Sequence, residues 1–248
     1  MKIMRYLLFS LTGLALCAGC SERIPENLTA EQADSLKAVV ERKIEEKKQI
    51  ARMRIEFEES YMGKSLSRYK PIIKKYSKRY GFDWRLITAQ IVQESGFKTE
   101  ARSRVGAHGL MQLMPGTAHE ISKELDIEYI MKNPRENITA GIYHLKKQYR
   151  MFPEAQYSDR IKLALASYNC GIGRIFDAQD ISRYFKKPEN VWINISPNLA
   201  LLKKSDWQLH LQVWPIGKPP YGYFYGYNET INYVDNIWRL YEAYRVIL

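Results

Sequence analysis

The fold class of this chain follows from residues 84–118, WRLITAQIVQESGFKTEARSRVGAHGLMQLMPGTA. In the first twelve positions, apolar residues recur at the spacing of one helix face. These residues are Leu86, Ile87, Ile91 and Val92. Asp83, just before them, is a suitable capping residue. The stretch therefore predicts a helix over 84–95, a loop over 96–112 and a second helix over 115–125.

The rest of the chain repeats this helical spacing and shows little of the alternation that is typical of strands. Further helices are predicted over 66–80, 134–152, 159–168, 172–179 and 228–246. A tract over 186–227 contains several prolines and is expected to be irregular, either as part of a cleft wall or as a cover over the core. The predicted fold is mostly α, with one domain over 63–248.

The segment over 28–59 is rich in Glu, Lys and Arg and contains no Gly or Pro. Its apolar residues, which also recur at helical spacing, are Leu36, Val40, Ile44, Ala51 and Ile55. With Thr29 and Gln32 as a capping box, the pattern predicts an amphipathic stalk helix that lays one stripe on the main domain. A longer coiled coil would need a stricter heptad repeat. The predicted organisation is a linker and charged helix over 20–62, followed by the domain.

The first twenty residues, MKIMRYLLFSLTGLALCAGC, place two basic residues before a short apolar run. This arrangement is typical of a secretory signal, which is predicted over 1–19, and the run is too short to span a bilayer core of ~30 Å. The ending Ala-Gly-Cys resembles a bacterial lipobox, although Cys17 stands where such motifs usually carry Leu. The resemblance implies cleavage before Cys20 and a lipid on its thiol. An ordinary signal peptide cut near Gly19 is the alternative.

Positive charge is concentrated in the predicted domain, since residues 61–248 carry 28 basic and 17 acidic residues. A basic exported domain suits an anionic polymer such as peptidoglycan, or an anionic lipid surface. Nucleic acid is another common partner for such a charge, but export argues against it. The four histidines are scattered without the spacing of metal ligands, so no metal site is predicted.

Glu94 is an unusual carboxylate, because it falls in the last turn of an otherwise apolar helix. The partial negative charge of a helix C-terminus and apolar neighbours both disfavour the anion and raise its pKa. A carboxyl group that stays protonated near neutral pH is what glycosidic cleavage requires of its general acid. By itself, however, a carboxylate at a helix end is most often only solvated. A catalytic role for Glu94 therefore depends on the motifs around it.

Several motifs around and after Glu94 occur in the order of a known family. The first are ESGF at 94–97, ARS at 101–103 and GAHGLMQLMPGTA at 106–118, and later blocks lie at 133–145, 164–171 and 226–234. Together they resemble the soluble-lytic-transglycosylase (SLT) domains of glycoside hydrolase family 23. The aromatic residues over 223–227 are similar to the branch that contains membrane-bound lytic murein transglycosylase F. The resemblance implies a lysozyme-like fold in which Glu94 faces a sugar cleft.

The resemblance implies that Glu94 is the single catalytic residue. It would first protonate the glycosidic oxygen between N-acetylmuramic acid and N-acetylglucosamine. It would then accept the proton of the muramyl C6 hydroxyl, which attacks C1, leaves a 1,6-anhydro end and outcompetes water by proximity. Ordinary glycosidases use a second carboxylate. Asp83 opens the same helix and Glu100 lies in a variable stretch, so both are interpreted as structural, and no cofactor is implied.

The resemblance also implies a set of substrate-binding side chains around Glu94. They are Ser103, Met111, Gln112, Met114, Tyr168, Asn169 and Tyr233. Tyr168 is expected to hydrogen-bond Glu94 and orient it, and Tyr233 to close the far wall of the cleft. For Met111 a place in the core is an equal alternative, because methionine is a common gap filler. Cys170 is interpreted as a small buried filler, because a catalytic thiol would need a poised histidine.

Three functions fit these observations. The first is a monomeric lytic transglycosylase for cell-wall remodelling or turnover, held on the periplasmic face of the outer membrane by a lipid on Cys20. Ser21, which follows Cys20 in place of an aspartate, favours that membrane. The second is a lysozyme-type hydrolase on the same fold, and the third is a non-catalytic lipoprotein that binds peptidoglycan. The joint presence of Glu94, Ser103, Gln112 and Tyr168 argues against the third.

Overall fold

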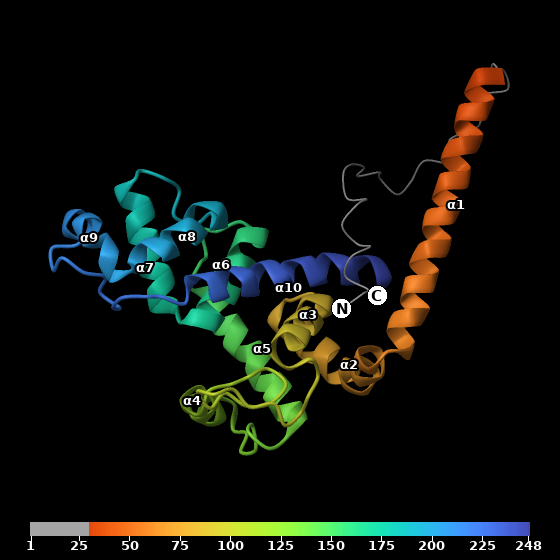
Figure 1. The fold of residues 1–248 in the computed structure, drawn as a ribbon. Coiled ribbons are helices and arrows are strands. Elements are labelled where there is room, and N and C mark those ends of the chain that lie inside the picture. The colour runs from red at the N-terminus through yellow and green to blue at the C-terminus, as the bar shows by residue number, and fades with distance from the viewer. Residues whose placement is uncertain (1–29) are drawn as a thin grey trace.

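The computed structural model describes residues 30–248, and Figure 1 shows the arrangement of its helices. The α-helices of this part are α1 (Ala30–Glu59), α2 (Tyr61–Tyr80), α3 (Trp84–Ser95), α4 (Pro115–Leu125), α5 (Pro134–Arg150), α6 (Tyr157–Cys170), α7 (Ile172–Tyr184), α8 (Trp192–Asn198), α9 (Trp207–Val213) and α10 (Tyr227–Ile247). Two 3₁₀-helices, η2 (Leu199–Leu202) and η3 (Lys204–Asp206), lie between α8 and α9. Within residues 30–248 there is no named strand, only isolated bridges from His108 to Arg102 and Leu113. The prediction of a mostly α fold is confirmed.

Three sequence predictions concern residues outside the described part of the chain. They are the signal over 1–19, the lipid on Cys20 and the start of the capping box at Thr29. Among the helices over 30–248, none combines the length and the low charge needed to cross a bilayer.

α3 lies at the centre of the molecule, where it packs against α10 and α2. Asp83 caps it as predicted, because its Oδ1 accepts the Arg85 N–H at 2.9 Å. Leu86, Ile87 and Ile91 are fully buried. Burial of such side chains contributes about 1.5–3 kcal/mol each. The apolar face of α3 therefore fixes its place in the core.

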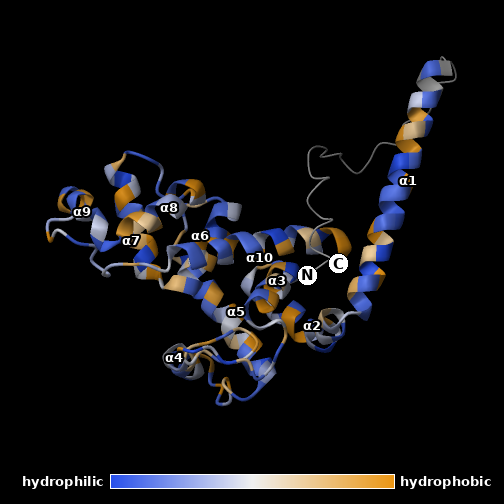
Figure 2. Ribbon diagram, in the orientation of Figure 1, coloured by the Kyte–Doolittle hydropathy of each residue, from blue (hydrophilic) through white to orange (hydrophobic). Residues whose placement is uncertain are grey.

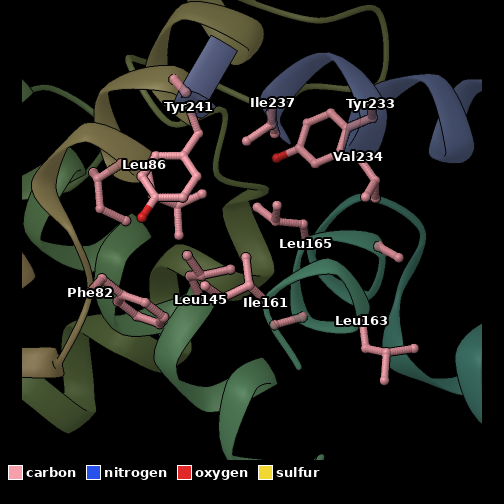
Figure 3. Close-up of a cluster of buried hydrophobic side chains, with 14 of the residues drawn as sticks. Phe82, Leu86, Leu145, Ile161, Leu163, Leu165, Tyr233, Val234, Ile237 and Tyr241 are labelled. Atoms are coloured by element: carbon pink, nitrogen blue, oxygen red, sulfur yellow. The ribbon is translucent and has the colours of Figure 1, made fainter. Parts of the chain in front are cut away.

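The core around α3 is built from helices that are distant in sequence. Figure 3 shows side chains of α3, α5, α6 and α10 that point into one interior, among them Leu86, Leu145, Ile161, Leu165, Val234 and Ile237. All six are buried. Since α10 supplies a large part of this cover, the last helix of the chain is needed to bury the helix that carries Glu94.

The tract over 186–227 is more regular than predicted, because it contains α8, η2, η3 and α9. Trp192, Ile195, Leu199 and Leu202 from this tract are buried in the main core. The expectation of an irregular tract was therefore wrong. Each of its helices is only three to seven residues long, and Pro197 lies inside α8, so the helical period is too short to stand out.

α1 extends away from the rest of the molecule, and only its last turns contact it (Figure 1). The ring of Phe57 lies 5.4 Å from that of Tyr244, and Arg54 Nε donates to the Ile247 carbonyl at 2.9 Å. Figure 2 shows hydrophilic and hydrophobic residues alternating along the helix.

The predicted contact between the apolar stripe of α1 and the main domain was wrong. The stripe residues Leu36, Val40, Ile44 and Ile55 are about half exposed. The apolar period predicted the helix correctly, but a period by itself does not identify what covers the apolar face.

Candidate active site

Glu94 lies in the last turn of α3, just before Gly96 ends the helix in the left-handed conformation with φ 56°. Its carboxyl group is held from α10, because the Tyr233 hydroxyl donates to Glu94 Oε1 at 2.5 Å. Tyr233 itself is buried. A residue 139 positions later in the chain therefore fixes the orientation of the predicted acid.

Burial raises the pKa of Glu94 to about 8, and the hydrogen bond from Tyr233 partly opposes this rise. The direction agrees with the prediction from sequence, in which apolar neighbours disfavour the carboxylate. At neutral pH most of the Glu94 population is therefore protonated. A carboxyl group in this state can donate a proton to a leaving oxygen.

The loop over 96–114 is held beside Glu94 by backbone and side-chain hydrogen bonds. Ser95 Oγ donates to the Leu110 carbonyl at 2.9 Å, and Gln112 Nε2 donates to the Gly109 carbonyl at 2.8 Å. From α5, the Asn137 side chain accepts the Met111 N–H at 2.8 Å. The loop is therefore part of a fixed framework that connects α3 with α5.

Gly109 is required where this loop crosses α5. It has a φ of 85°, a conformation that side-chain-bearing residues rarely adopt. A Cβ at this position would also lie 2.5 Å from Asn137 Nδ2. Any larger residue at position 109 would displace Asn137 and the loop that it holds.

Glu94, the loop, α6 and α10 line an open cleft of about 500 Å³. Its lining residues are Gln93, Glu94, Ser103, Val105, Ala107, Gln112, Met114, Tyr168, Asn169, Glu229, Asn232, Tyr233 and Asn236. Most of these side chains are polar, and Met114 and Val105 add exposed apolar surface. Such a mixture suits a ligand with many hydroxyl groups and a few apolar groups.

The structure brings most of the predicted site residues together. Those that line the cleft are Glu94, Ser103, Gln112, Met114, Tyr168, Asn169 and Tyr233. Met111 does not line it, because its side chain is fully buried and faces Gly141, where a Cβ would lie 2.5 Å from the Met111 sulfur. For Met111 the structure supports the core alternative, and the predicted substrate contact was wrong.

The hydrogen bond to Glu94 that was expected from Tyr168 comes from Tyr233. The Tyr168 hydroxyl donates to the Met111 carbonyl at 2.6 Å, and it is Tyr233 that donates to Glu94. Tyr168 therefore positions the loop, whereas Tyr233 positions the acid. Asn169 connects α6 to α10, because its Oδ1 accepts a hydrogen bond from Thr230 Oγ1 at 2.7 Å.

The other acidic and thiol candidates occupy structural positions. Asp83 caps the opposite end of α3 and accepts a hydrogen bond from the Tyr241 hydroxyl at 3.3 Å. Glu100 is exposed, and its carboxylate lies 4.0 Å from His108 Nε2. Burial raises the pKa of Cys170 to about 12, so its thiol stays protonated and is a poor nucleophile.

Sequence reasoning missed the contribution of α10 beyond Tyr233. Glu229, Asn232 and Asn236 also line the cleft. Residues 229, 232, 233 and 236 recur at the spacing of one helix face, so a polar stripe on the last helix was the available signal. It was not recognised because the same helix also carries a stronger apolar stripe.

Comparison with known sequences agrees with this geometry. The sequence family described as Transglycosylase SLT domain matches residues 71–191. The chain carries an SLT domain. The matched residues include α3, the loop beside Glu94 and Tyr168, whereas α10 with Tyr233 lies beyond them.

Two relatives of the SLT domain are named membrane-bound lytic murein transglycosylase F. The protein from Desulfosudis oleivorans is 36% identical over 180 residues, which are 71% of this chain and 36% of the relative. The protein from Vibrio parahaemolyticus is 32% identical over 179 residues, which are 72% of this chain and 31% of the relative. The chain thus spans about a third of the length of these relatives.

Among solved structures, the SLT domain is similar to an inactive mutant of the lytic transglycosylase Slt from Pseudomonas aeruginosa. The sequence identity is 28% and the TM-score is 0.48, over 71% of this chain and 24% of that one. The match to residues 71–191 confirms the family predicted from the motifs, and the helices of residues 30–248 confirm the mostly α fold.

Proposed function

We propose that this protein is a peptidoglycan lytic transglycosylase. It cleaves the β-1,4 bond between N-acetylmuramic acid and N-acetylglucosamine and leaves 1,6-anhydromuramyl ends. The observation that carries the proposal is the Glu94 carboxyl group, which lines the cleft, is held by Tyr233 and has a pKa raised to about 8. The names of the relatives support the same activity.

In the first step, the protonated Glu94 gives its proton to the glycosidic oxygen as the bond from C1 to that oxygen breaks. N-acetylglucosamine then leaves with a hydroxyl group, and Glu94 becomes a carboxylate. In the second step, the muramyl C6 hydroxyl attacks C1 while Glu94 takes its proton. The new bond joins O6 to C1, Glu94 is protonated again, and no water is consumed.

A buried acid with a raised pKa suits both steps. It is protonated at the start, when a proton must be donated. After donation, the carboxylate lies in an environment that disfavours its charge, which makes it a strong base for the C6 hydroxyl. One carboxyl group can therefore act first as acid and then as base.

A lysozyme-type hydrolase is the alternative, and one observation favours it. Glu229 on α10 is a second carboxylate that lines the cleft. Hydrolysis by two carboxylates needs a nucleophile or a base opposite the acid. Glu229 is exposed, which suits a residue that contacts solvent or substrate more than a buried nucleophile.

Digestion of purified peptidoglycan sacculi, followed by mass spectrometry, separates the two reactions. We expect 1,6-anhydromuramyl products from the wild-type protein and from Glu229→Gln, and none from Glu94→Gln. The matched control is Glu100→Gln, since Glu100 is exposed and does not line the cleft. Reducing muramyl ends that are lost in Glu229→Gln would instead establish the hydrolase.

We also propose that a lipid on Cys20 holds the protein on the periplasmic face of the outer membrane. The support is the sequence of residues 1–21. Metabolic labelling with a radioactive fatty acid tests it. Label in the wild-type chain that disappears in Cys20→Ser is expected, and label that persists in Cys20→Ser would contradict it.

A further inference from the structure

Gln90 lies one helical turn before Glu94 on α3 and is fully buried. Its Nε2 donates to the Tyr233 hydroxyl oxygen at 3.1 Å, and the same hydroxyl donates to Glu94 Oε1. Gln90 Oε1 has no hydrogen-bond partner in the described part of the chain. A buried amide with one oxygen unpaired disfavours folding, and an apolar side chain of the same size would avoid this. The one hydrogen bond that Gln90 makes therefore points to a role in the site.

The hydrogen bond from Gln90 determines the direction of the Tyr233 proton. A phenol has one proton, and here its oxygen already accepts the amide proton of Gln90. The phenol proton is then available for Glu94 Oε1. Oε1 accepts the hydrogen bond from Tyr233. The acidic proton of Glu94 therefore lies on Oε2, the carboxyl oxygen that remains free to face the cleft.

Without the amide of Gln90, the Tyr233 hydroxyl could turn around. It would then accept a proton from Glu94 Oε1 in place of donating one. The acid proton of Glu94 would be used inside the protein and would not face the glycosidic oxygen. The acid would be present but unproductive.

We infer that Gln90 is a positioning residue: through the Tyr233 hydroxyl, it keeps the acid proton of Glu94 on the oxygen that faces the cleft. This inference rests on the proposed function, because it assumes that Glu94 is the acid. Gln90 acts through Tyr233 and does not line the cleft.

The two successive hydrogen bonds, from Gln90 to Tyr233 and from Tyr233 to Glu94, also affect the pKa of Glu94. Donation by Gln90 polarises the Tyr233 hydroxyl and strengthens its bond to the Glu94 carboxylate. This lowers the pKa of Glu94 in opposition to burial, so loss of Gln90 raises it further. The other titratable groups that line the cleft with Glu94 and Tyr233 are Tyr168 from α6 and Glu229 from α10, and the loop contributes only uncharged side chains to this lining.

The first test is Gln90→Met, which keeps the volume and removes the donor, with Gln90→Leu as a second variant. We expect kcat to fall about tenfold with little change in KM. A positioned general acid accelerates a reaction by ~10²–10⁴-fold, and misplacing its proton should remove part of that acceleration. The alkaline limb of the pH–rate profile should move to higher pH. The matched control is Thr88→Val, which removes another buried polar group of α3 that donates only to the Trp84 carbonyl. Thr88→Val should leave the pH profile unchanged.

A double-mutant cycle with Tyr233→Phe tests the route of the effect. If Gln90 acts through Tyr233, Gln90→Met should have no further effect on the pH profile of Tyr233→Phe. A shift that persists in the Tyr233→Phe background, or a Gln90→Met enzyme with the wild-type profile, would overturn the inference.

Infrared titration of the Glu94 carboxyl band, assigned by its loss in Glu94→Gln, provides a readout that needs no substrate. A higher Glu94 pKa in Gln90→Met supports the inference even if the products in the sacculus assay are those of a hydrolase. An unchanged pKa contradicts the inference even if 1,6-anhydro products are found. Failure of the inference and failure of the proposed function are thereby distinguishable.

Discussion

α3 and α1 both carry apolar residues at helical spacing, but their surroundings differ. α3 has seven buried residues among twelve and carries Glu94, whereas none of the described side chains of the 30-residue α1 is buried. α3 is covered by α2 and α10, whereas most of α1 faces solvent. The difference shows that the spacing of apolar residues predicts where a helix forms, whereas the stability of that helix and its chemistry depend on which elements cover it. Four substitutions or conditions test this contrast.

The largest expected effect is on activity, at the end of α3. Glu94→Gln should lower the rate of sacculus digestion by about 10³-fold or more, because it removes the only acid proton of the proposed reaction. Its circular dichroism and melting temperature should not fall, since a neutral amide replaces a carboxyl group that is already protonated at neutral pH. Residual activity above a tenth of wild type would place the acid elsewhere.

The second effect is on stability and compares isoleucines in the two helices. Ile87→Ala in α3 should lower the free energy of unfolding by about 2–5 kcal/mol, because it leaves a cavity in a fully buried site. Ile44→Ala in α1 should change it by less than ~0.5 kcal/mol, because Ile44 is about half exposed. Urea denaturation measures both. Equal losses would mean that α1 is covered in solution.

The same contrast explains how much of the fold could be predicted from the sequence. The bounds of α3 and α4 were predicted correctly because a capping residue or a proline marks the start of each helix. α8 and α9 were missed because each spans only seven residues, about two turns. The side chains that cover a helix come from distant parts of the sequence. The spacing of the apolar residues in α1 therefore could not predict that its stripe is exposed.

For the site, the motifs predicted which residues meet but not which atoms bond. Tyr168 and Tyr233 were both expected near Glu94, and both line the cleft. Which hydroxyl reaches the carboxyl group depends on differences of a few ångströms in the packing of α6 and α10. Gln90 gave no signal in the sequence, because a glutamine on an apolar helix is normally an exposed residue.

The third effect concerns pH and again involves α3. The pKa of Glu94 is about 8 in the folded protein and near 4.5 in the unfolded chain. Between these values the folded protein holds a proton that the unfolded chain has lost. Stability from Glu94 is therefore fully present below pH 4.5 and is lost as the pH rises toward 8, at no more than about 1.4 kcal/mol per pH unit.

Glu94→Gln isolates this contribution. Asp177, with a pKa raised to about 7, contributes in the same direction, and His144, with a pKa lowered to about 4, contributes in the opposite direction. Both remain in the variant, so the difference between wild type and Glu94→Gln reports Glu94 alone. Thermal melts from pH 5 to pH 8 should show a steeper decline for the wild type. Parallel curves would mean that Glu94 titrates normally.

The smallest expected effect concerns the one place where α1 is covered. Phe57 is partly buried against Tyr244 of α10, so Phe57→Ala should cost about 1–2 kcal/mol, less than the 3–5 kcal/mol of a fully buried phenylalanine. The loss should appear as faster trypsin cleavage within α1, while sacculus digestion stays within twofold of wild type. Ile44→Ala is the matched control, because Ile44 lies on the exposed part of the same helix.

If Phe57→Ala instead lowered the melting temperature as much as Ile87→Ala, the last turns of α1 would belong to the core. The boundary between projecting helix and domain would then lie before residue 57, because the same ring contact would support both α1 and the helix that covers Glu94.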